Sequence, residues 1–349
     1  MKLFFVGLSG GVDSSVAAKR LIEHGHTVVG VFIKVWQPDF LQCDWEKERL
    51  DAMRVAAHLD IPFLTFDAVS AYKQNVADYM ISEYRDGRTP NPDIMCNQHV
   101  KFGAFLDFAL SQGATKIATG HYAQIVQKNG RFTLERGHDK NKDQSYFLWT
   151  LSQEQLAHTY FPVGNSTKTD IRKEAQRAGI PTFAKNDSQG ICFLGQIDIK
   201  EFLSHYIMSE KGNVHDEHGN IVGTHDGALF FTIGQRHGFI HNSTTSENKP
   251  VYVYEKDMDT NTITVSSTQR YVLDTKIELS HINQITEFPT EIIEAQFRYR
   301  QTPCTVSVTA IDTSHCRLEV LSTSVEYPSK GQSCVLYTMN TCLGGGIIS

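Results

Sequence analysis

The chain carries, near its start, an octapeptide whose composition is typical of a phosphate-binding turn: Gly7-Leu8-Ser9-Gly10-Gly11-Val12-Asp13-Ser14. It follows an apolar run at residues 3–6 and precedes an amphipathic stretch at residues 15–24, so it should lead from a strand into a helix. Gly10 and Gly11 let the backbone bend tightly against a ligand, and the amides of the first helical turn attract an anion. We therefore expect the octapeptide to bind the phosphates of a nucleotide. The structural alternative is a plain glycine turn before a capped helix.

The octapeptide lacks the Gly-x-x-x-x-Gly-Lys-Ser/Thr pattern of the P-loop, and with it the lysine that reaches the terminal phosphates in γ-phosphoryl transfer. It is similar instead to the PP-loop, Ser-Gly-Gly-x-Asp-Ser, of the ATP pyrophosphatase superfamily. This resemblance implies that ATP is split between its α and β phosphates, with adenylation of a substrate oxygen and release of pyrophosphate. Asp13 is unusual beside phosphates, and it suits a Mg²⁺ ligand or a helix cap.

Two cysteines lie in sequence contexts that could support thiol chemistry. Cys96 ends the segment 91–96, between a proline-containing loop and an expected helix, and Cys192 lies in the loop-like segment 188–193. Asp93 precedes Cys96 by three residues and suits a general acid or base. For each cysteine the alternative is a buried small hydrophobic side chain. The other cysteines have no motif around them and are expected to be core or surface thiols: Cys43, Cys304, Cys316, Cys334 and Cys342.

Strand-like and helix-like stretches alternate through roughly the first two hundred residues and predict the framework that must hold these groups. The alternation is typical of an α/β fold, with a parallel sheet, helices on both faces and ligands at the carboxyl ends of the strands. The octapeptide, Ile33 and Gly120 all come at such ends. The expected strands are 3–6, 27–33, 63–66 and 116–119, the expected helices are 14–24, 46–59, 71–85, 101–111 and 169–178, and Asn129-Gly130 should join a hairpin of residues 122–127 and 131–135.

The character of the sequence changes from about residue 212, where short alternating segments indicate all-β structure. We expect three domains: a PP-loop catalytic domain at 1–205, a small central β domain at 206–268 and a C-terminal β-barrel domain at 269–349. The segments expected to be strands are 228–233, 250–254, 262–265, 294–299, 305–310, 316–320 and 333–337.

The composition excludes several other classes of protein. The 349 residues are 40% hydrophobic, enough for a sizeable core, and no apolar run suits a membrane span or a signal peptide. We expect a cytoplasmic protein without a membrane partner. The 7 cysteines are irregularly spaced, which favours free thiols over a disulfide framework or a transition-metal site. The net charge of −6 gives no global nucleic-acid signal, so any RNA binding must rest on a local basic surface.

Further segments beyond the octapeptide carry a more specific resemblance. In the same order along the chain, from residue 7 to about residue 334, they are similar to the tRNA-specific 2-thiouridylase family. That resemblance implies that the C2 oxygen of the wobble uridine in tRNA is replaced by sulfur, using ATP. The segments are 91–97, 118–123, 142–146, 188–193, 232–236 and 298–301.

The implied chemistry needs activation, because the C2 oxygen of uracil leaves poorly until AMP is attached to it. The resemblance implies that Cys192 carries a persulfide, loaded by a cysteine desulfurase directly or through a sulfur-relay protein. The persulfide attacks C2, and Cys96 then breaks the sulfur–sulfur bond, leaving a Cys96–Cys192 disulfide that reductants reopen. In an alternative order, Cys96 releases hydrosulfide, which attacks the base itself.

The resemblance also implies cofactors and binding residues. The cofactors are ATP and Mg²⁺. Ile33 and Gly120 match ATP contacts beside the octapeptide, although Ile33 suits a core position equally well. His121 could instead be a structural imidazole, and residues 142–144 an exposed charged loop. The positions that match tRNA contacts are Asn91, Pro92, Asp93, His121, Lys142, Asp143, Gln144, Arg298, Tyr299 and Gln332.

Two other functions fit parts of the sequence. Another PP-loop enzyme, such as a synthetase that forms amides or guanidines, would use the octapeptide but leave both cysteine segments idle. A non-catalytic tRNA-binding protein could use ATP for regulation and the cysteines as a redox switch. Pyrophosphate release that requires tRNA would distinguish an enzyme acting on tRNA from such a sensor.

Overall fold

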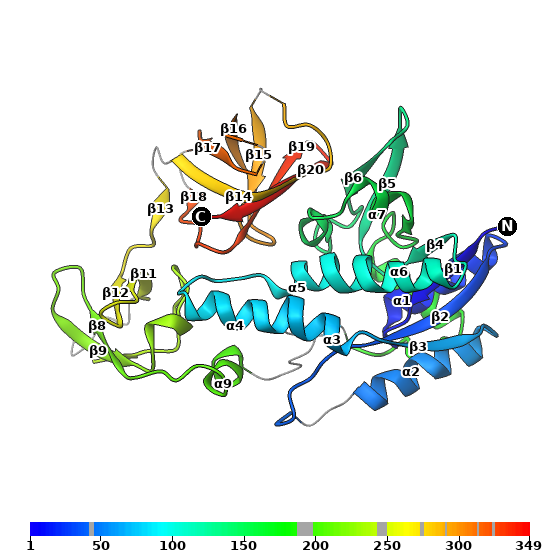
Figure 1. Ribbon diagram of the computed structural model, residues 1–349, viewed down its shortest axis with the longest axis horizontal. Helices are drawn as coiled ribbons and strands as arrows, with labels where there is room; N and C mark the ends of the chain where they lie inside the picture. Colours follow the sequence, from blue (N-terminus) through cyan, green and yellow to red (C-terminus); the bar gives the residue numbers. More distant parts are fainter. Residues whose placement is uncertain are drawn as a thin grey trace.

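The computed structural model contains a parallel α/β sheet, a small mixed sheet and a closed β-barrel (Figure 1). The predicted order, an α/β domain followed by small β modules, is confirmed. Among the residues that the structure describes, no helix has the length and apolarity to cross a membrane. The structure describes residues 1–41, 45–186, 198–242, 250–272, 276–289, 292–312, 314–322 and 325–349, so Cys43 and Cys192 lie outside it.

The first sheet is parallel, with the strand order β3-β2-β1-β4-β7. The chain moves outward from β1 to β3 and returns on the other side of β1 as β4. The crevice between β1 and β4 is therefore a topological switch point, where open α/β sheets bind ligands. The strands are β1 (Leu3–Gly7), β2 (Thr27–Lys34), β3 (Phe63–Asp67), β4 (Lys116–Ala118) and β7 (Thr159–Tyr160), of which all but β7 were predicted.

Helices cover both faces of this sheet, because successive side chains of a strand point to opposite faces. Phe4 and Val6 of β1 pack with α1, α2 and α8, whereas Phe5 packs with the helical segments between residues 69 and 111. On the first face lie α1 (Val12–Glu23), α2 (Trp45–His58) and α8 (Lys168–Arg177). On the second lie α3 (Val69–Tyr72), η1 (Lys73–Ala77), α4 (Asp78–Arg85), α5 (Pro92–Met95), η2 (Cys96–Ala104) and α6 (Phe105–Ser111). Shorter helices follow: η3 (Ser145–Leu148), α7 (Gln153–Ala157) and α9 (Ile199–Ser204).

The predicted hairpin is present and joins two parts of the molecule. β5 (Ala123–Lys128) and β6 (Arg131–Arg136) pair as expected around Asn129, whose φ of 51° is tolerated in such a turn. The outer edge of β6 pairs with the last strand of the chain, with Leu134 opposite Cys342. The hairpin therefore fixes the barrel to the α/β domain.

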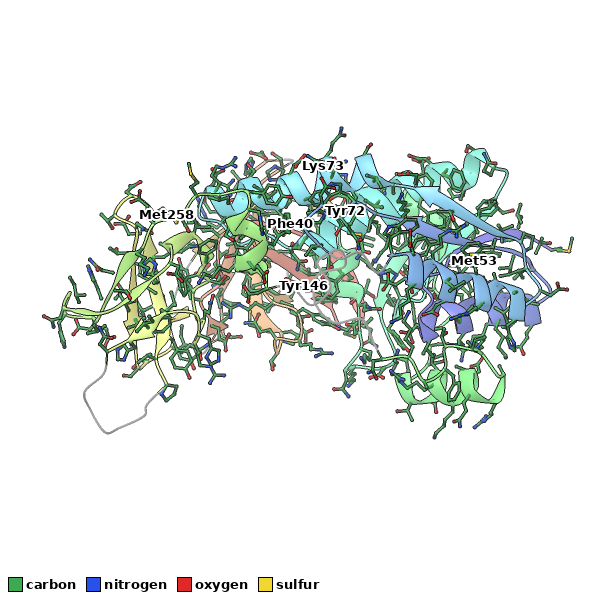
Figure 2. All side chains as sticks on the ribbon, turned by 90° about the horizontal axis from the view of Figure 1, so that it is seen from below. Phe40, Met53, Tyr72, Lys73, Tyr146 and Met258 are labelled. Carbon is green, nitrogen blue, oxygen red and sulfur yellow. The ribbon has the colours of Figure 1, made fainter. Side chains whose placement is uncertain are left out.

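The central β module packs against the end of α4. A Cβ atom on Gly87 would lie 2.6 Å from Met258 Cγ, and Figure 2 shows Met258 beside this helix. Residues 228–233 do not form the predicted strand; they begin as a 3₁₀ helix, because Ala228, Leu229 and Phe230 are all buried rather than alternately exposed. The module contains β8 (Gly212–His215), β9 (Ile221–His225), η4 (Ala228–Phe230), β10 (Ile240–His241), β11 (Tyr252–Asp257) and β12 (Thr262–Ser266).

Six strands close into the C-terminal barrel through a pairing of β14 with β20. The last strand was not predicted, because a run of glycines such as Gly344-Gly345-Gly346 is typical of a loop. The glycines are needed for close packing instead: a Cβ atom on Gly344 would lie 2.0 Å from the carbonyl oxygen of Asn283. The barrel strands are β14 (Lys276–Gln284), β15 (Ile293–Gln296), β16 (Cys304–Ala310), β17 (Cys316–Val320), β19 (Ser333–Thr338) and β20 (Thr341–Ile348), and β13 (Tyr271–Val272) pairs with β18 (Val325–Glu326) beside it.

Candidate active site

The octapeptide forms the turn from β1 into α1, as predicted. Its start is fixed to β2, because the Leu8 amide donates to the Val31 carbonyl at 2.8 Å. Gly10 has a φ of +68°, and a Cβ atom there would lie 2.8 Å from Asp51 Cβ on α2. Glycine is required at this position by both the backbone conformation and the neighbouring helix.

Serine hydroxyls stabilise the turn from within. Ser9 Oγ accepts the Gly11 amide at 3.3 Å and lies 3.3 Å from Ser14 Oγ. Ser15 Oγ donates to the Gly11 carbonyl at 2.7 Å. These bonds hold the loop in one conformation at the amino end of α1, where amides and the helix dipole favour a phosphate.

The end of β4 lies directly against this loop. A Cβ atom on Gly120 would lie 2.7 Å from the Ser14 amide nitrogen and 2.8 Å from the Asp13 carbonyl carbon. Ile33 reaches the other side, with its Cδ1 3.7 Å from a Cβ atom built on Gly7. The structure thus brings the octapeptide, Gly120 and Ile33 together at the switch point of the sheet.

Asp13 is held by two side chains that sequence reasoning did not single out. Tyr122 donates its hydroxyl to Asp13 Oδ1 at 2.7 Å, and Lys168 Nζ lies 2.8 and 2.7 Å from the two carboxylate oxygens. Because the ammonium of Lys168 takes both oxygens, this arrangement does not fit a direct Mg²⁺ ligand at Asp13. The sequence contained one indication that Lys168 has a special role. It is the first residue of a helix, where the helix dipole disfavours a positive charge.

His121 follows Gly120 but points into the protein. Its Nδ1 lies 2.7 Å from Thr119 Oγ1, and its ring packs between Phe102 and Phe161 at centroid distances of 5.5 and 5.8 Å. Burial lowers the pKa of His121 well below its ordinary value. In this conformation it is a neutral structural imidazole beside the nucleotide edge, rather than an exposed contact.

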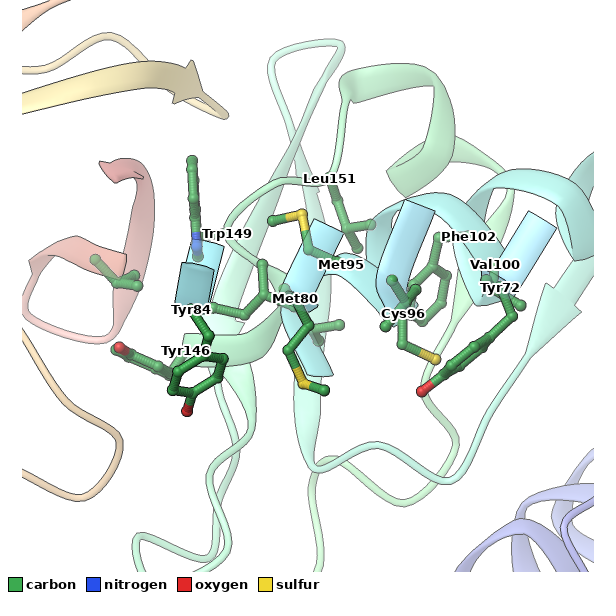
Figure 3. Close-up of a cluster of buried hydrophobic side chains, with 14 of the residues drawn as sticks. Tyr72, Met80, Tyr84, Met95, Cys96, Val100, Phe102, Tyr146, Trp149 and Leu151 are labelled. Carbon is green, nitrogen blue, oxygen red and sulfur yellow. The ribbon is translucent and has the colours of Figure 1, made fainter. Parts of the chain in front are cut away.

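Cys96 lies at the junction of α5 and η2. Asn91 caps the start of α5 through its side-chain oxygen, and Pro92 and Asp93 form the first turn. The thiol is buried, with 2% of Cys96 exposed, and Figure 3 shows it beside Tyr72. Because Cys192 lies outside the described residues, its predicted disulfide with Cys96 stays a prediction.

Residues 137–145 form a loop ordered by its own carboxylates. Asp143 accepts the amides of Gly137 and Ser145 at 2.9 and 3.1 Å and pairs with Arg136 at 3.0 Å. Gln144 and Tyr122 exchange two hydrogen bonds of 2.9 Å, so the loop is fixed to the segment that follows Gly120. Two of the predicted tRNA-binding residues, Asp143 and Gln144, therefore have structural partners.

A cavity of about 840 Å³ opens between this loop and the barrel. Basic residues outnumber the acidic Asp143 and Glu294 in its lining, so it is a local basic surface on an acidic protein. The basic residues are Arg136, which pairs with Asp143, and His138, Lys140, Lys142 and Arg300. The cavity also reaches two further tRNA-binding candidates, Asp143 and Tyr299.

The two remaining tRNA-binding candidates make contacts between modules. Arg298 donates through Nη2 to the Ile233 carbonyl at 2.8 Å and through Nη1 to Glu326 at 3.2 Å, which connects the barrel with the central module. Gln332 donates to the Thr89 carbonyl at 2.9 Å. The barrel thus supports the loop that leads into α5 and Cys96.

Comparison with known proteins decides the family. Residues 2–196 match the "tRNA methyl transferase HUP domain" model, 200–267 the "tRNA methyl transferase PRC-barrel domain" and 274–348 the "Aminomethyltransferase beta-barrel domain". A protein of Nitrosomonas eutropha named tRNA-specific 2-thiouridylase MnmA is 42% identical over 352 residues, which is 99% of this chain and 97% of that protein. The chain belongs to the tRNA-specific 2-thiouridylase family.

A second relative agrees with this assignment. The tRNA-specific 2-thiouridylase MnmA of Enterococcus faecalis is 42% identical over 351 residues, covering 98% of this chain and 94% of that protein. Among solved structures, a 4-thiouridine synthetase in complex with RNA and bound ATP matches at 19% identity with a TM-score of 0.36, over 58% of this chain and 50% of that chain. The resemblance found in the sequence is confirmed at the level of the family.

Proposed function

We propose that this chain is an ATP-dependent sulfurtransferase that converts the wobble uridine of tRNA to 2-thiouridine. The observation that carries the proposal is the 42% identity with 2-thiouridylases along nearly the whole chain. The nucleotide edge supports it, because the octapeptide, Gly120 and Ile33 lie together at one end of a parallel sheet.

The first step is adenylation of the base. The uridine O2 attacks the α phosphorus of ATP, the bond from that phosphorus to the bridging oxygen breaks, and pyrophosphate leaves with the electron pair. The amides at the start of α1 stabilise the negative charge on the phosphates. Because Asp13 is paired with Lys168, we propose no direct Mg²⁺ ligand at Asp13.

The second step transfers sulfur in the cytoplasm. A cysteine desulfurase or a relay protein loads Cys192 with a persulfide, whose terminal sulfur attacks C2 while AMP leaves with the C2–O bond pair. The Cys96 thiolate then attacks the Cys192 sulfur, which leaves the transferred sulfur on the base and forms a Cys96–Cys192 disulfide. A cellular thiol reductant supplies two electrons to reopen it. In the alternative order, the Cys96 thiolate attacks the Cys192 sulfur of the persulfide before C2 is modified, and hydrosulfide is released.

Asp93 lies in the first turn of α5 and would move a proton on the base or the thiol.

The tRNA would lie across the basic cavity between the 137–145 loop and the barrel. Lys142 and Arg300 line this cavity, and Tyr299 offers a ring on which an unpaired base could stack. Asn91 and Pro92 begin the helix that carries Asp93 and Cys96, where the target base must arrive. Recognition by these few contacts on an acidic chain predicts strongly salt-dependent binding.

The test is pyrophosphate release measured with three additions: no tRNA, unmodified tRNA, and the same tRNA already thiolated at the wobble uridine. We expect release only with the unmodified tRNA, because thiolated tRNA has no O2 to adenylate. Equal release in all three would instead indicate another PP-loop enzyme. ATP binding without release under any condition would indicate the non-catalytic, redox-sensing tRNA-binding protein.

A further inference from the structure

Ion pairs connect helices α1 and α8 at both ends of their contact, and at the end away from the octapeptide Lys19 and Arg20 share Glu174. Lys19 on α1 reaches Glu174 on α8, with Nζ to Oε1 at 3.4 Å. Lys168 on α8 reaches Asp13 on α1 in the opposite direction, at 2.7 Å. The two pairs are similarly shielded from solvent, since the lysine side chains are 20% and 12% exposed. Only the second lies at the nucleotide edge.

Lys168 occupies a position where a lysine is electrostatically unfavourable. It is the first residue of α8, after the cap Thr167, and the positive end of the helix dipole repels its ammonium. Its amide donates to Asp139 Oδ2 at 3.0 Å, which fixes the backbone at the base of the 137–145 loop. The side chain is thus directed from a fixed start toward the octapeptide.

The charge at the octapeptide requires a cation. Asp13 places a carboxylate in the first turn of α1, where the phosphates of ATP must also lie, and the two anions repel each other. An ammonium carries three donors, so it can hold a carboxylate and a phosphate oxygen at the same time.

We propose that Lys168 contacts the β and γ phosphates of ATP and stabilises pyrophosphate as it leaves. The proposal rests on the function proposed above. During the step the bond between the α phosphorus and the bridging oxygen breaks, and negative charge grows on that oxygen. Lys168 keeps its proton and supplies the countercharge, as the lysine of a P-loop does from a different place in the sequence.

The direct test replaces Lys168 with methionine, which keeps an unbranched apolar side chain and removes the ammonium. We expect tRNA-dependent pyrophosphate release to fall by about a hundredfold, the size seen when one donor to a developing charge is removed. Lys168→Arg should recover part of the rate, since it restores the positive charge. Lys19→Met is the matched control, because it also removes a lysine that pairs α1 with α8, and it should release pyrophosphate at the wild-type rate.

A binding measurement separates phosphate contact from a merely structural role. By calorimetry, Lys168→Met should lose about tenfold in affinity for inorganic pyrophosphate and keep its affinity for adenosine. The same comparison in the Asp13→Asn background decides whether Lys168 acts only through Asp13. We expect the loss to persist there; no loss in that background would show that the lysine merely neutralises the carboxylate, and would overturn the proposal.

The outcomes also distinguish this proposal from the function on which it rests. If wild-type protein thiolates tRNA and Lys168→Met does so equally fast, the inference about Lys168 is wrong and the sulfurtransferase remains. If wild-type protein never thiolates tRNA, the proposed function is wrong, while the pyrophosphate titration still reports whether Lys168 binds phosphate.

Discussion

At the scale of single residues, the site combines groups whose exposure differs from what their sequence contexts suggested. Cys96 and His121 both come from segments similar to a family site, and both side chains are buried. A buried Cys96 suits a core role as well as a catalytic one. The two roles are distinguished by whether loss of the thiol changes tRNA thiolation or only stability. A variant that removes a thiol of equal burial elsewhere provides the comparison.

Cys96→Ala should abolish tRNA thiolation, with a loss of about a hundredfold or more, because no thiol remains to break the persulfide bond. Cys334→Ala is the matched control, since Cys334 is fully buried in the barrel core. Both variants should unfold at a slightly lower temperature than the wild type. Thiolation is measured on tRNA and melting by calorimetry. If both variants thiolate normally, Cys96 is a core residue only.

His121 gives a prediction for pH dependence. Burial keeps its pKa in the folded state well below the ordinary value of 6.5, so below this pH the unfolded chain binds more protons. The free energy of unfolding should therefore fall as the pH drops below 6.5. His121→Gln should weaken this dependence without removing it, because burial also lowers the pKa of His99 and of His225. Urea unfolding at several pH values measures it; identical slopes for variant and wild type would refute the assignment.

At the scale of elements, the pattern of apolar residues in the sequence was sufficient to predict four of the strands in the sheet that carries the octapeptide. Apolar runs of strand length predicted β1 to β4, and Gly10-Gly11 after β1 predicted the turn. Alternation failed at residues 228–230, where three successive side chains are buried, and at β20, whose glycines serve close strand packing. Local pattern does not report such tertiary constraints.

The contacts on Asp13 show the same limit within the site. Tyr122 and Lys168 are 109 and 155 residues away along the chain. No spacing rule relates them, and only the packing of β4 and α8 against α1 brings them together. The octapeptide and Gly120 could be predicted because each directly follows a strand.

Gly120→Ala tests the contact between β4 and the octapeptide. The new methyl group would lie 2.7 Å from the Ser14 amide nitrogen, so the loop must shift. We expect pyrophosphate release to fall at least about tenfold, since displacement of a binding loop misplaces the phosphates. Gly113→Asn is the control at the other end of β4, in the α6–β4 connection, because nothing lies within 4 Å of a Cβ there and asparagine tolerates its φ of +86°. Normal release by Gly120→Ala would contradict the role of this contact.

At the scale of the whole molecule, the barrel supports the catalytic domain from two sides. The β6–β20 pairing extends the barrel sheet into the predicted hairpin, and Gln332 reaches the Thr89 carbonyl before α5. Arg298 connects the barrel to the central module. The proposed tRNA-binding surface is therefore assembled from parts that are distant in sequence.

Arg298→Ala should lower the free energy of unfolding by about 1–3 kcal/mol, because the Ile233 carbonyl and Glu326 lose their partner. It should also weaken tRNA binding, since the surface beside Tyr299 loses its support. Arg317→Ala is the control: Arg317 pairs with Glu278 on the exposed side of the barrel, and its loss should change neither quantity measurably. Urea unfolding and tRNA titration measure the two effects. Unchanged stability in Arg298→Ala would contradict its role between the modules.

The central claim is that sulfur reaches uridine through Cys192 after ATP activates the base. The most direct measurement is mass spectrometry of nucleosides from unmodified tRNA incubated with ATP, Mg²⁺, a persulfide donor and either wild-type protein or Cys192→Ser. We predict 2-thiouridine with the wild type and none with Cys192→Ser, while both bind ATP equally. Thiolation by Cys192→Ser at the wild-type rate would contradict the account.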